Sequence, residues 1–596
     1  MIKNFIVTAL RNAAKQKIYT IINVSGIAIG MACCILILLY IKDELSYDKY
    51  HENADNIYRV VCNSTIKDNL RDFAIVPAPV GPAAAEAIPE ITTFVRLLNF
   101  ESGADQPEHI KYDDKDFDAE GVFGIDSTFF NLFSYKFIKG DPKTALEKPG
   151  SIVITEQAAI LIFGDEEPIG KVLNMPGIEF DLEVTGVIEN VPRNSHFTFN
   201  YLISMSSMPP EYTQELLRQW LFYTTHTYVL VEKKTDPDDL KNKINEVFAA
   251  NVGERAEEAG IHVEFFLQKL TDIHLRSNRM MEIEPNSDIR YIYAFSLIAF
   301  FILFIACVNF INLSTARSAN RAREVGLRKV FGGYRTHLIG QFLTESVILS
   351  VSGLLLSVIL VSAILPLFNN LTQMDLSIGF LLDRYILLSL AGIVIFTGII
   401  AGSYPAFYLS GFKPVSVFHR KLSTGNIGGV MRRVLVVGQF SISIALIICT
   451  IIVLNQVRYM KNSKLGFDKE QMLVLPLRSF ETVNNFKTVK ELLSANPNIL
   501  DVSFSSSVPG KNHAMNIFVP EGGSDNNTYS SQILYVDKDF ADTYKLEIID
   551  GQDFREERMP DSPNEYLINE SAARMLGWEN SAVGKRLTNM SFRTDG

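Results

Sequence analysis

The sequence predicts a membrane α-helical protein that carries mixed α/β domains outside the bilayer. Three observations support this: long charge-free apolar stretches, an uneven distribution of charge, and an internal repeat. The 596 residues are 47% hydrophobic and have a mean hydropathy of +0.13, which is high for a soluble protein of this size. A chain of this length is expected to form several domains.

Five stretches of 23 to 25 residues contain no Asp, Glu, Lys or Arg. A helix of that length is about 35 Å long, enough to cross a hydrocarbon core of about 30 Å. Buried helices of soluble proteins rarely run so far without a charge. The stretches are Ile18–Ile41, Tyr291–Leu313, Ser346–Phe368, Tyr385–Leu409 and Val434–Val457. The first is followed by Lys42-Asp43-Glu44 without a small-residue cleavage site, so we expect an uncleaved span.

Positive charge is concentrated in residues 1–17, 314–337 and 411–433, which together hold fifteen basic residues and one acidic residue. The rest of the chain therefore holds 41 basic and 66 acidic residues. Because basic loops stay in the cytoplasm, we expect a cytoplasmic N-terminus in the bacterial inner membrane. The acidic remainder is then translocated surface, and the net charge of −11 gives no indication of nucleic-acid binding.

These features predict seven segments. They are a cytoplasmic N-terminus (1–17), a first span (18–41), a first external domain (43–288), a three-span domain (291–410) with the cytoplasmic loop 314–337, a cytoplasmic linker (411–433), a fifth span (434–457) and a second external domain (458–596). In the first external domain, short Val/Ile/Tyr/Thr-rich runs predict strands at Ile57–Cys62, Ser151–Thr155, Leu182–Ile188 and Thr225–Val231. Helical patterns lie between them at Pro82–Ile88, Ser127–Phe133, Glu156–Phe163 and Pro237–Ala249.

The chain repeats itself at a period of about 411 to 420 residues, and order, spacing and residue type all agree. The matching segments are 125–140 with 536–551, 153–173 with 567–587, and Tyr47-Asp48-Lys49 with Phe467-Asp468-Lys469. The first span plus its external domain is thus repeated as the fifth span plus its external domain. Since a full second repeat would need three more spans, we expect eight helices in the complete protein and an incomplete second domain here.

Two small-residue patterns lie within the spans. Gly26-x-x-x-Gly30 and Gly398-x-x-x-Gly402 would permit close helix approach. No charged residue lies inside any of the five stretches. Their absence argues against proton or ion coupling, which usually needs an ionisable group within the membrane.

The loop after the second span reads Arg-Ala-Arg-Glu-Val-Gly-Leu-Arg-Lys-Val-Phe-Gly-Gly over residues 321–333. Val325, the Arg328-Lys329 pair and Gly332 recur at spacings of three and four, and two glycines end the pattern, which predicts a short amphipathic helix. The alternative is a basic loop that only anchors topology and touches anionic lipid. Such an anchor would not need the acid, the glycines and the apolar residues in a fixed order.

This loop resembles the coupling loop of the permeases typified by MacB, FtsX and the lipoprotein-releasing transporters, where R-x-R-E-x-G-x-R-x-x-x-G-x follows the second span. The resemblance covers the whole chain and implies a MacB-like periplasmic core over 43–288 and an FtsX-like permease domain over 291–410. It also implies that the loop docks in a groove of a cytoplasmic ABC ATPase subunit. The implied ATPase-coupling residues are Arg323, Glu324, Gly326, Arg328, Lys329 and Gly332. The chain departs from MacB in lacking a fused ATPase domain and in being duplicated.

No catalytic, cofactor or metal site is predicted. The sequence has no G-x-x-x-x-G-K-[ST] motif, so ATP is expected to bind a partner subunit and not this chain. The nine histidines lack zinc-ligand spacing. Asn194-Ser195-His196 predicts a turn, because adjacency in sequence does not make Ser and His a catalytic pair.

The resemblance implies the permease subunit of a mechanotransmission ABC transporter that exports peptides, drugs or other periplasmic cargo. Its partners would be the ATPase and membrane lipid and, for export, a periplasmic adaptor and an outer-membrane channel. Two alternatives stay open: a regulatory scaffold for periplasmic cell-wall hydrolases, and a lipoprotein-releasing permease. A second external domain as large as the first favours the transporter architecture over a simple regulator.

Overall fold

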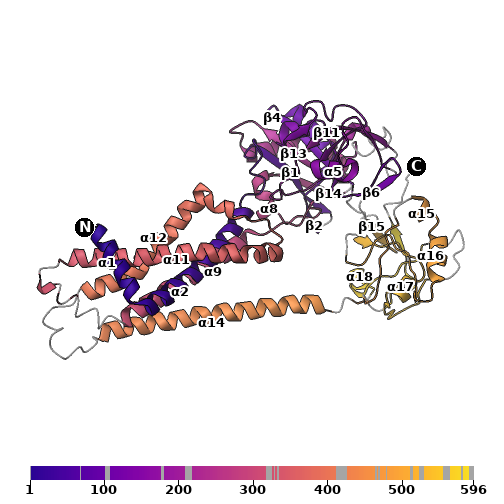
Figure 1. Ribbon diagram of the computed structural model, residues 1–596. Helices are drawn as coiled ribbons and strands as arrows, with labels where there is room; N and C mark the ends of the chain where they lie inside the picture. The colour runs from indigo at the N-terminus through magenta and orange to yellow at the C-terminus, as the bar shows by residue number, and fades with distance from the viewer. Residues whose placement is uncertain are drawn as a thin grey trace. The chain divides into compact units, whose positions relative to one another are not determined.

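The computed structural model divides into two compact units, Met1–Leu45 with Asp288–Ser463 and Ser46–Ser287 with Lys464–Gly596 (Figure 1). We call the first the helical unit, and we treat residues 46–287 and 464–596 as the first and second α/β domains. The residues described are 2–66, 69–100, 108–175, 180–208, 218–258, 260–316, 325, 327, 329–331, 334–410, 426–463, 466–467, 470–477, 480–510, 514–522, 529–554, 564–578 and 581–589.

Among the described residues of the helical unit, five helices are long and apolar enough to cross a membrane, which confirms the predicted fold class. They are α2 (Lys17–Glu44), α9 (Ile289–Ala316), α11 (Arg335–Thr372), α12 (Arg384–Ser410) and α14 (Asn426–Asn462). A shorter amphipathic helix, α1 (Ile2–Lys15), precedes them, and the turn η3 (Ile378–Leu382) lies between α11 and α12.

The helices extend beyond the charge-free stretches. α11 begins at Arg335 and α14 at Asn426, inside segments expected to be loop and linker, and α1 lies within the expected N-terminal segment. A charge-free run reports only the length that lies in hydrocarbon. The backbone hydrogen bonds continue past it, because Arg and Lys are tolerated where the helix reaches the interface.

Glycines allow α11 to pack closely between α2 and α12. A Cβ at Gly353 of α11 would come within 2.8 Å of Ile27 in α2. On α12, a Cβ at Gly398 would come within 2.6 Å of Val347, and one at Gly402 within 2.8 Å of Ser346. The Gly398-x-x-x-Gly402 pattern therefore lies at a helix interface, as close backbone approach requires.

The first α/β domain is built on one mixed sheet. The strand order is β14-β1-β13-β4-β7-β12-β9-β11-β10-β5-β6, with β2, β3 and β8 paired to β1, β13 and β11. All named pairs are antiparallel except β11 with β9 and β12 with β7. The strands are β1 (Ile57–Ile66), β2 (Asn69–Phe73), β3 (Val76–Pro77), β4 (Ile91–Asn99), β5 (Glu108–Tyr112), β6 (Lys115–Ala119), β7 (Val122–Ile125), β8 (Phe137–Lys139), β9 (Ser151–Thr155), β10 (Val172–Met175), β11 (Phe180–Ile188), β12 (Tyr201–Ser204), β13 (Tyr223–Val231) and β14 (Ile261–Lys269).

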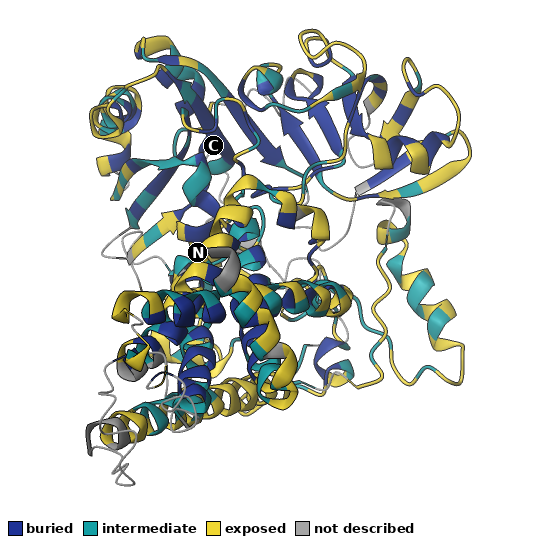
Figure 2. Ribbon diagram, turned by 60° about the vertical axis from the view of Figure 1, so that its left-hand side comes forward, coloured by how far each residue is buried: buried dark blue, intermediate teal, exposed yellow. Residues whose placement is uncertain are grey.

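Helices α3 (Val80–Ala87), α4 (Phe129–Leu132), α5 (Glu156–Phe163), α7 (Pro237–Glu258) and α8 (Ile273–Arg276) cover the sheet. The four predicted strands coincide with β1, β9, β11 and β13, and the four predicted helices with α3, α4, α5 and α7. Figure 2 shows the buried residues gathered along the strands. The centre of the core is aromatic, with Phe129, Phe133, Phe197 and Tyr228 in contact mainly through ring edges.

The second α/β domain reproduces part of the first. Its sheet, β16-β15-β17 (Tyr529–Ile533, Ala514–Pro520 and Leu587–Asn589), has the same connectivity as β6-β5-β10. Helices α17 (Phe540–Thr543) and α18 (Glu570–Met575) begin at the repeat positions of α4 and α5. The N-cap side chains also correspond, because Thr155 accepts from the Ala158 amide and Asn569 from the Ala572 amide. Two further helices, α15 (Phe480–Asn484) and α16 (Phe486–Ser494), precede them.

We expect Gly398→Leu to destabilise the helical unit by about 1–3 kcal/mol, because the added side chain would separate α12 from α11. Thermal unfolding of the detergent-solubilised chain measures the effect. Gly392→Leu is the matched control on the same helix, since no atom lies within 4 Å of a Cβ there. Equal destabilisation by both substitutions would contradict the close packing of Gly398.

Two buried histidines should make the first α/β domain sensitive to acid. Burial lowers the pKa of His51 to about 4 and that of His226 to about 3. Because an unfolded histidine takes up a proton below its ordinary pKa of 6.5, stability is complete above that pH and falls as the pH drops below it. Between pH 6.5 and its folded pKa, each group should lower the free energy of unfolding by about 1.4 kcal/mol for each pH unit.

The measurement is the unfolding midpoint of the full chain at pH 7 and pH 5. His51→Gln should make the decrease shallower, whereas His262→Gln, at an exposed position on β14, should leave it unchanged. An unaltered decrease in His51→Gln would show that this histidine is not responsible.

Candidate coupling site between α9 and α11

The six predicted coupling residues lie in the segment that joins α9 to α11. Lys329 is the one among them that the structure describes; Arg323, Glu324, Gly326, Arg328 and Gly332 lie outside the described residues. Residues 325, 327, 329 and 330 are helical, and the Phe331 amide donates to the Leu327 carbonyl over 3.1 Å. Residues 325, 327 and 329–331 therefore define the candidate site, and we call them the coupling segment.

Lys329 ties this short helix to the end of α12. Its Nζ donates to the carbonyl oxygen of Ser410, the last residue of α12, over 2.5 Å. Arg335, the first residue of α11, donates through Nε to Ser410 Oγ over 3.3 Å. Terminal carbonyls of a helix lack intrahelical partners and carry partial negative charge, so two cations at this end stabilise it.

An apolar contact fixes the same helix on its inner side. Val325 is buried and packs with Leu338 and Phe342 of α11 and Ala406 of α12. With 100° between successive residues, Lys329 lies about 40° from Val325 around the helix, so both side chains face the bundle. The helix is therefore held by α11 and α12 together.

The opposite side of the helix is apolar and exposed. Leu327, Val330 and Phe331 are 48%, 59% and 86% exposed. Helical geometry places them at about 200°, 140° and 240° from Val325, on the side away from the bundle. These three residues are not among the predicted coupling residues, which are charged residues and glycines; helical angles counted outward from Val325, taken as the inward-facing residue, indicate them.

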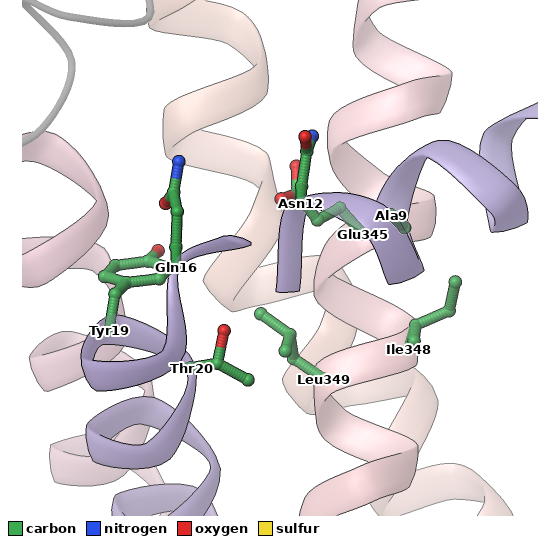
Figure 3. Close-up of a pocket in the computed structure, with 8 residues that line it drawn as sticks. All are labelled: Ala9, Asn12, Gln16, Tyr19, Thr20, Glu345, Ile348 and Leu349. Atoms are coloured by element: carbon green, nitrogen blue, oxygen red, sulfur yellow. The ribbon is translucent and has the colours of Figure 1, made fainter. Parts of the chain in front are cut away.

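The start of α11 also contacts α1. Figure 3 shows a small pocket lined by Ala9, Asn12, Gln16, Tyr19, Thr20, Glu345, Ile348 and Leu349, which come from α1, the α1–α2 junction, α2 and α11. Glu345 is buried here among polar side chains. Helix α1 is thus part of the packed end of the helical unit that carries the coupling segment.

The described residues of this segment present one buried side and one exposed apolar side. Three apolar side chains project from a helix that contacts both α11 and α12. Among the residues that the structure describes, no group of three or more His, Cys, Asp or Glu side chains could hold a metal ion.

Comparison with known families gives two matches in the order the architecture suggests. Residues 20–247 match the MacB-like periplasmic core domain, and residues 296–414 match the FtsX-like permease C-terminal domain. The second match includes the coupling segment and helices α11 and α12.

Curated relatives agree with these matches. An uncharacterised ABC transporter permease of Bacillus subtilis, YvrN, is 22% identical over 67% of this chain and 95% of its own length. The macrolide export ATP-binding/permease protein MacB of Pasteurella multocida is 24% identical over 49% of this chain and 42% of its own length. The chain thus spans less than half of that MacB relative.

Among solved structures, the periplasmic region of MacB from Actinobacillus actinomycetemcomitans aligns with a TM-score of 0.27 at 14% identity, covering 37% of this chain and 91% of that one. The extracellular domain of the ABC-type transporter YknZ aligns with a TM-score of 0.24 at 13% identity, covering 36% and 100%. Taken together, the two family domains, the named relatives and the five apolar helices identify the chain as a multi-pass ABC transporter permease of the MacB/FtsX-like family.

Proposed function

We propose that this chain is the permease subunit of a mechanotransmission ABC transporter, driven by an ATPase on a separate polypeptide. The observation that carries the proposal is the short helix clamped to α11 and α12 with Leu327, Val330 and Phe331 exposed. An ATPase that closes on ATP would press this surface, and the load would pass to the membrane helices and the α/β domains. The chain itself would neither bind nor hydrolyse ATP.

We further propose that the docking surface lies in the cytoplasm of a bacterium and that the α/β domains lie across the inner membrane. The distribution of basic residues supports this orientation. The cargo would be a peptide, drug or other substrate taken up on the far side, with a periplasmic adaptor and an outer-membrane channel as further partners. The MacB relatives, named as macrolide exporters, favour export over the regulatory and lipoprotein-releasing alternatives.

Phe331→Ser should weaken binding of the ATPase at least about tenfold, because an exposed aromatic side chain is typical of residues that dominate an interface. The measurement is co-purification of the ATPase with the permease, with the amount of membrane-inserted permease as reference. Leu382→Ser is the matched control: Leu382 is 78% exposed but lies at the opposite ends of α11 and α12. Full ATPase recovery with Phe331→Ser would instead indicate that the segment only anchors in lipid.

Orientation can be tested by cysteine labelling in a variant without the five native cysteines. A cysteine at the exposed position Lys148 should react with an impermeant thiol reagent in spheroplasts, and one at Ser318, between α9 and α11 in the sequence, should react only after lysis. The reverse pattern would overturn the charge argument.

A further inference from the structure

The first α/β domain is joined to the membrane helices through two segments of chain. Helix α2 ends at Glu44 and α9 begins at Ile289. We call residues 46–51 the entry segment and residues 273–287 the exit segment. A flexible linker in either place would absorb any movement of the helices, so the contacts of these segments decide how the domain responds.

The entry segment is held by a buried carboxylate. Asp48 is fully buried and has a left-handed backbone (φ 59°). Its Oδ1 accepts from the His196 amide over 3.1 Å and lies 2.9 Å from His196 Nδ1. The Asp48 amide donates to the Asn194 carbonyl over 2.8 Å, and the Asn194 side chain donates to Ser46. The predicted turn at 194–196 thus holds the chain where it leaves α2.

The chemistry of Asp48, His196 and Tyr228 determines which atoms carry the protons in this contact. A carboxylate only accepts hydrogen bonds, so Nδ1 of His196 carries the proton that it donates to Asp48. Nε2 then accepts from the Tyr228 hydroxyl over 2.7 Å. Burial raises the pKa of Tyr228, which keeps that hydroxyl protonated. Because Tyr228 occupies Nε2 and the whole group is buried, His196 cannot serve as a base for Ser195.

The exit segment is held by a buried ion pair. Both terminal guanidinium nitrogens of the fully buried Arg59 contact Glu282, whose side chain is 12% exposed, Nη1 to Oε2 over 2.6 Å and Nη2 to Oε1 over 2.9 Å. The Ser277 hydroxyl bonds to both partners, and His226 Nε2 donates to the Met281 carbonyl over 2.8 Å. Such a bidentate pair is strong and tightly defined in geometry.

The contact of the entry segment and the contact of the exit segment are adjacent in the sheet. Arg59 on β1 and Tyr228 on β13 are direct partners in the antiparallel register. The Tyr47 ring in the entry segment also stacks on His274 in the exit segment, with ring centres 3.3 Å apart and planes 3° apart. A buried polar chain therefore runs from Asp48 through His196, Tyr228 and Arg59 to Glu282.

We propose that this chain, which we name the connector lock, joins the entry and exit segments into one rigid element, so that α2 and α9 move the first α/β domain as a single body. The proposal rests on the proposed function and names its positioning residues: Asp48, His196, Tyr228, Arg59 and Glu282. A buried charge left without its partner is strongly unfavourable, so neither end of the lock opens readily.

The first experiment tests the lock without the ATPase. Tyr228→Phe removes one hydroxyl, and hydrogen exchange of backbone amides in the full chain should become at least about tenfold faster in both segments. Tyr223→Phe is the matched control: the same change on the same strand removes a hydrogen bond to Ser64 and should affect neither segment. Unchanged exchange in the exit segment of Tyr228→Phe would overturn the lock.

Should Tyr228→Phe fail to fold, Ser277→Ala tests the lock from the other end. It removes the exit-segment hydroxyl that bonds to Arg59 and Glu282, so exchange should become faster in the entry segment as well. Faster exchange confined to the exit segment would show two independent contacts and contradict the proposal.

The second experiment uses the complex with the ATPase. Spin labels at Lys148→Cys and Leu382→Cys, in the cysteine-free background, report the distance between the first α/β domain and the helical unit. ATP should change this distance in the parent and in Tyr223→Phe, and Tyr228→Phe should lose at least half of the change. A full change in Tyr228→Phe overturns transmission through the lock. No change in the parent would contradict the proposed function, and the exchange experiment would still decide whether the lock exists.

Discussion

Hydrocarbon provides no hydrogen-bond partner for a backbone amide or carbonyl, and the rest of this structure depends on that constraint. Among the residues that the structure describes, each of the five charge-free stretches is an unbroken helix, and the proposed lock, the coupling segment and the sheet lie outside them. The segments that join the helical unit to the first α/β domain begin where these helices end. The structure holds these segments by buried polar contacts.

Polar contacts occur at or just beyond the ends of two of these helices. Ser410, the last residue of α12, accepts hydrogen bonds from Lys329 and Arg335. Beyond the end of α2, Asp48 accepts a hydrogen bond from His196. The end of α12 has unsatisfied backbone carbonyls and a partial negative charge, so the two cations at Ser410 stabilise it. The Ser410 contacts thus hold residues within the helical unit, and the Asp48 contact holds residues within the first α/β domain.

The fold class, the spans and the regular elements of the first α/β domain could be predicted from sequence, because they follow from local patterns. Charge-free length predicts a span, and β-branched runs such as Ser151–Thr155 predict a strand. The repeat was also visible, since matching residues keep their order and spacing. Where a helix ends could not be predicted, because α11 and α14 continue into charged interfacial sequence that the hydropathy criterion excludes.

The lock and the exposed face of the coupling segment depend on long-range geometry. Asp48 and His196 are 148 residues apart, and Arg59 and Glu282 are 223 apart. Nothing in the sequence near Tyr228 indicates that it lies opposite Arg59. The exposed position of Phe331 could be predicted from helical angles only by assuming that Val325 faces inward, and the structure supplies that burial.

The duplicated domain allows the sequence to be aligned with itself. Thr155 and Asn569 differ as residues but cap α5 and α18 with the same bond to the amide three positions on. Gly140 and Gly551 have nearly identical left-handed backbones, with φ of 89° and 87°. The two copies have therefore kept a hydrogen-bond acceptor at the helix cap (Thr155 and Asn569) and a backbone conformation at the turn (Gly140 and Gly551). The first position is free to change its residue while it keeps an acceptor, whereas the second is tied to glycine by the shape of its turn.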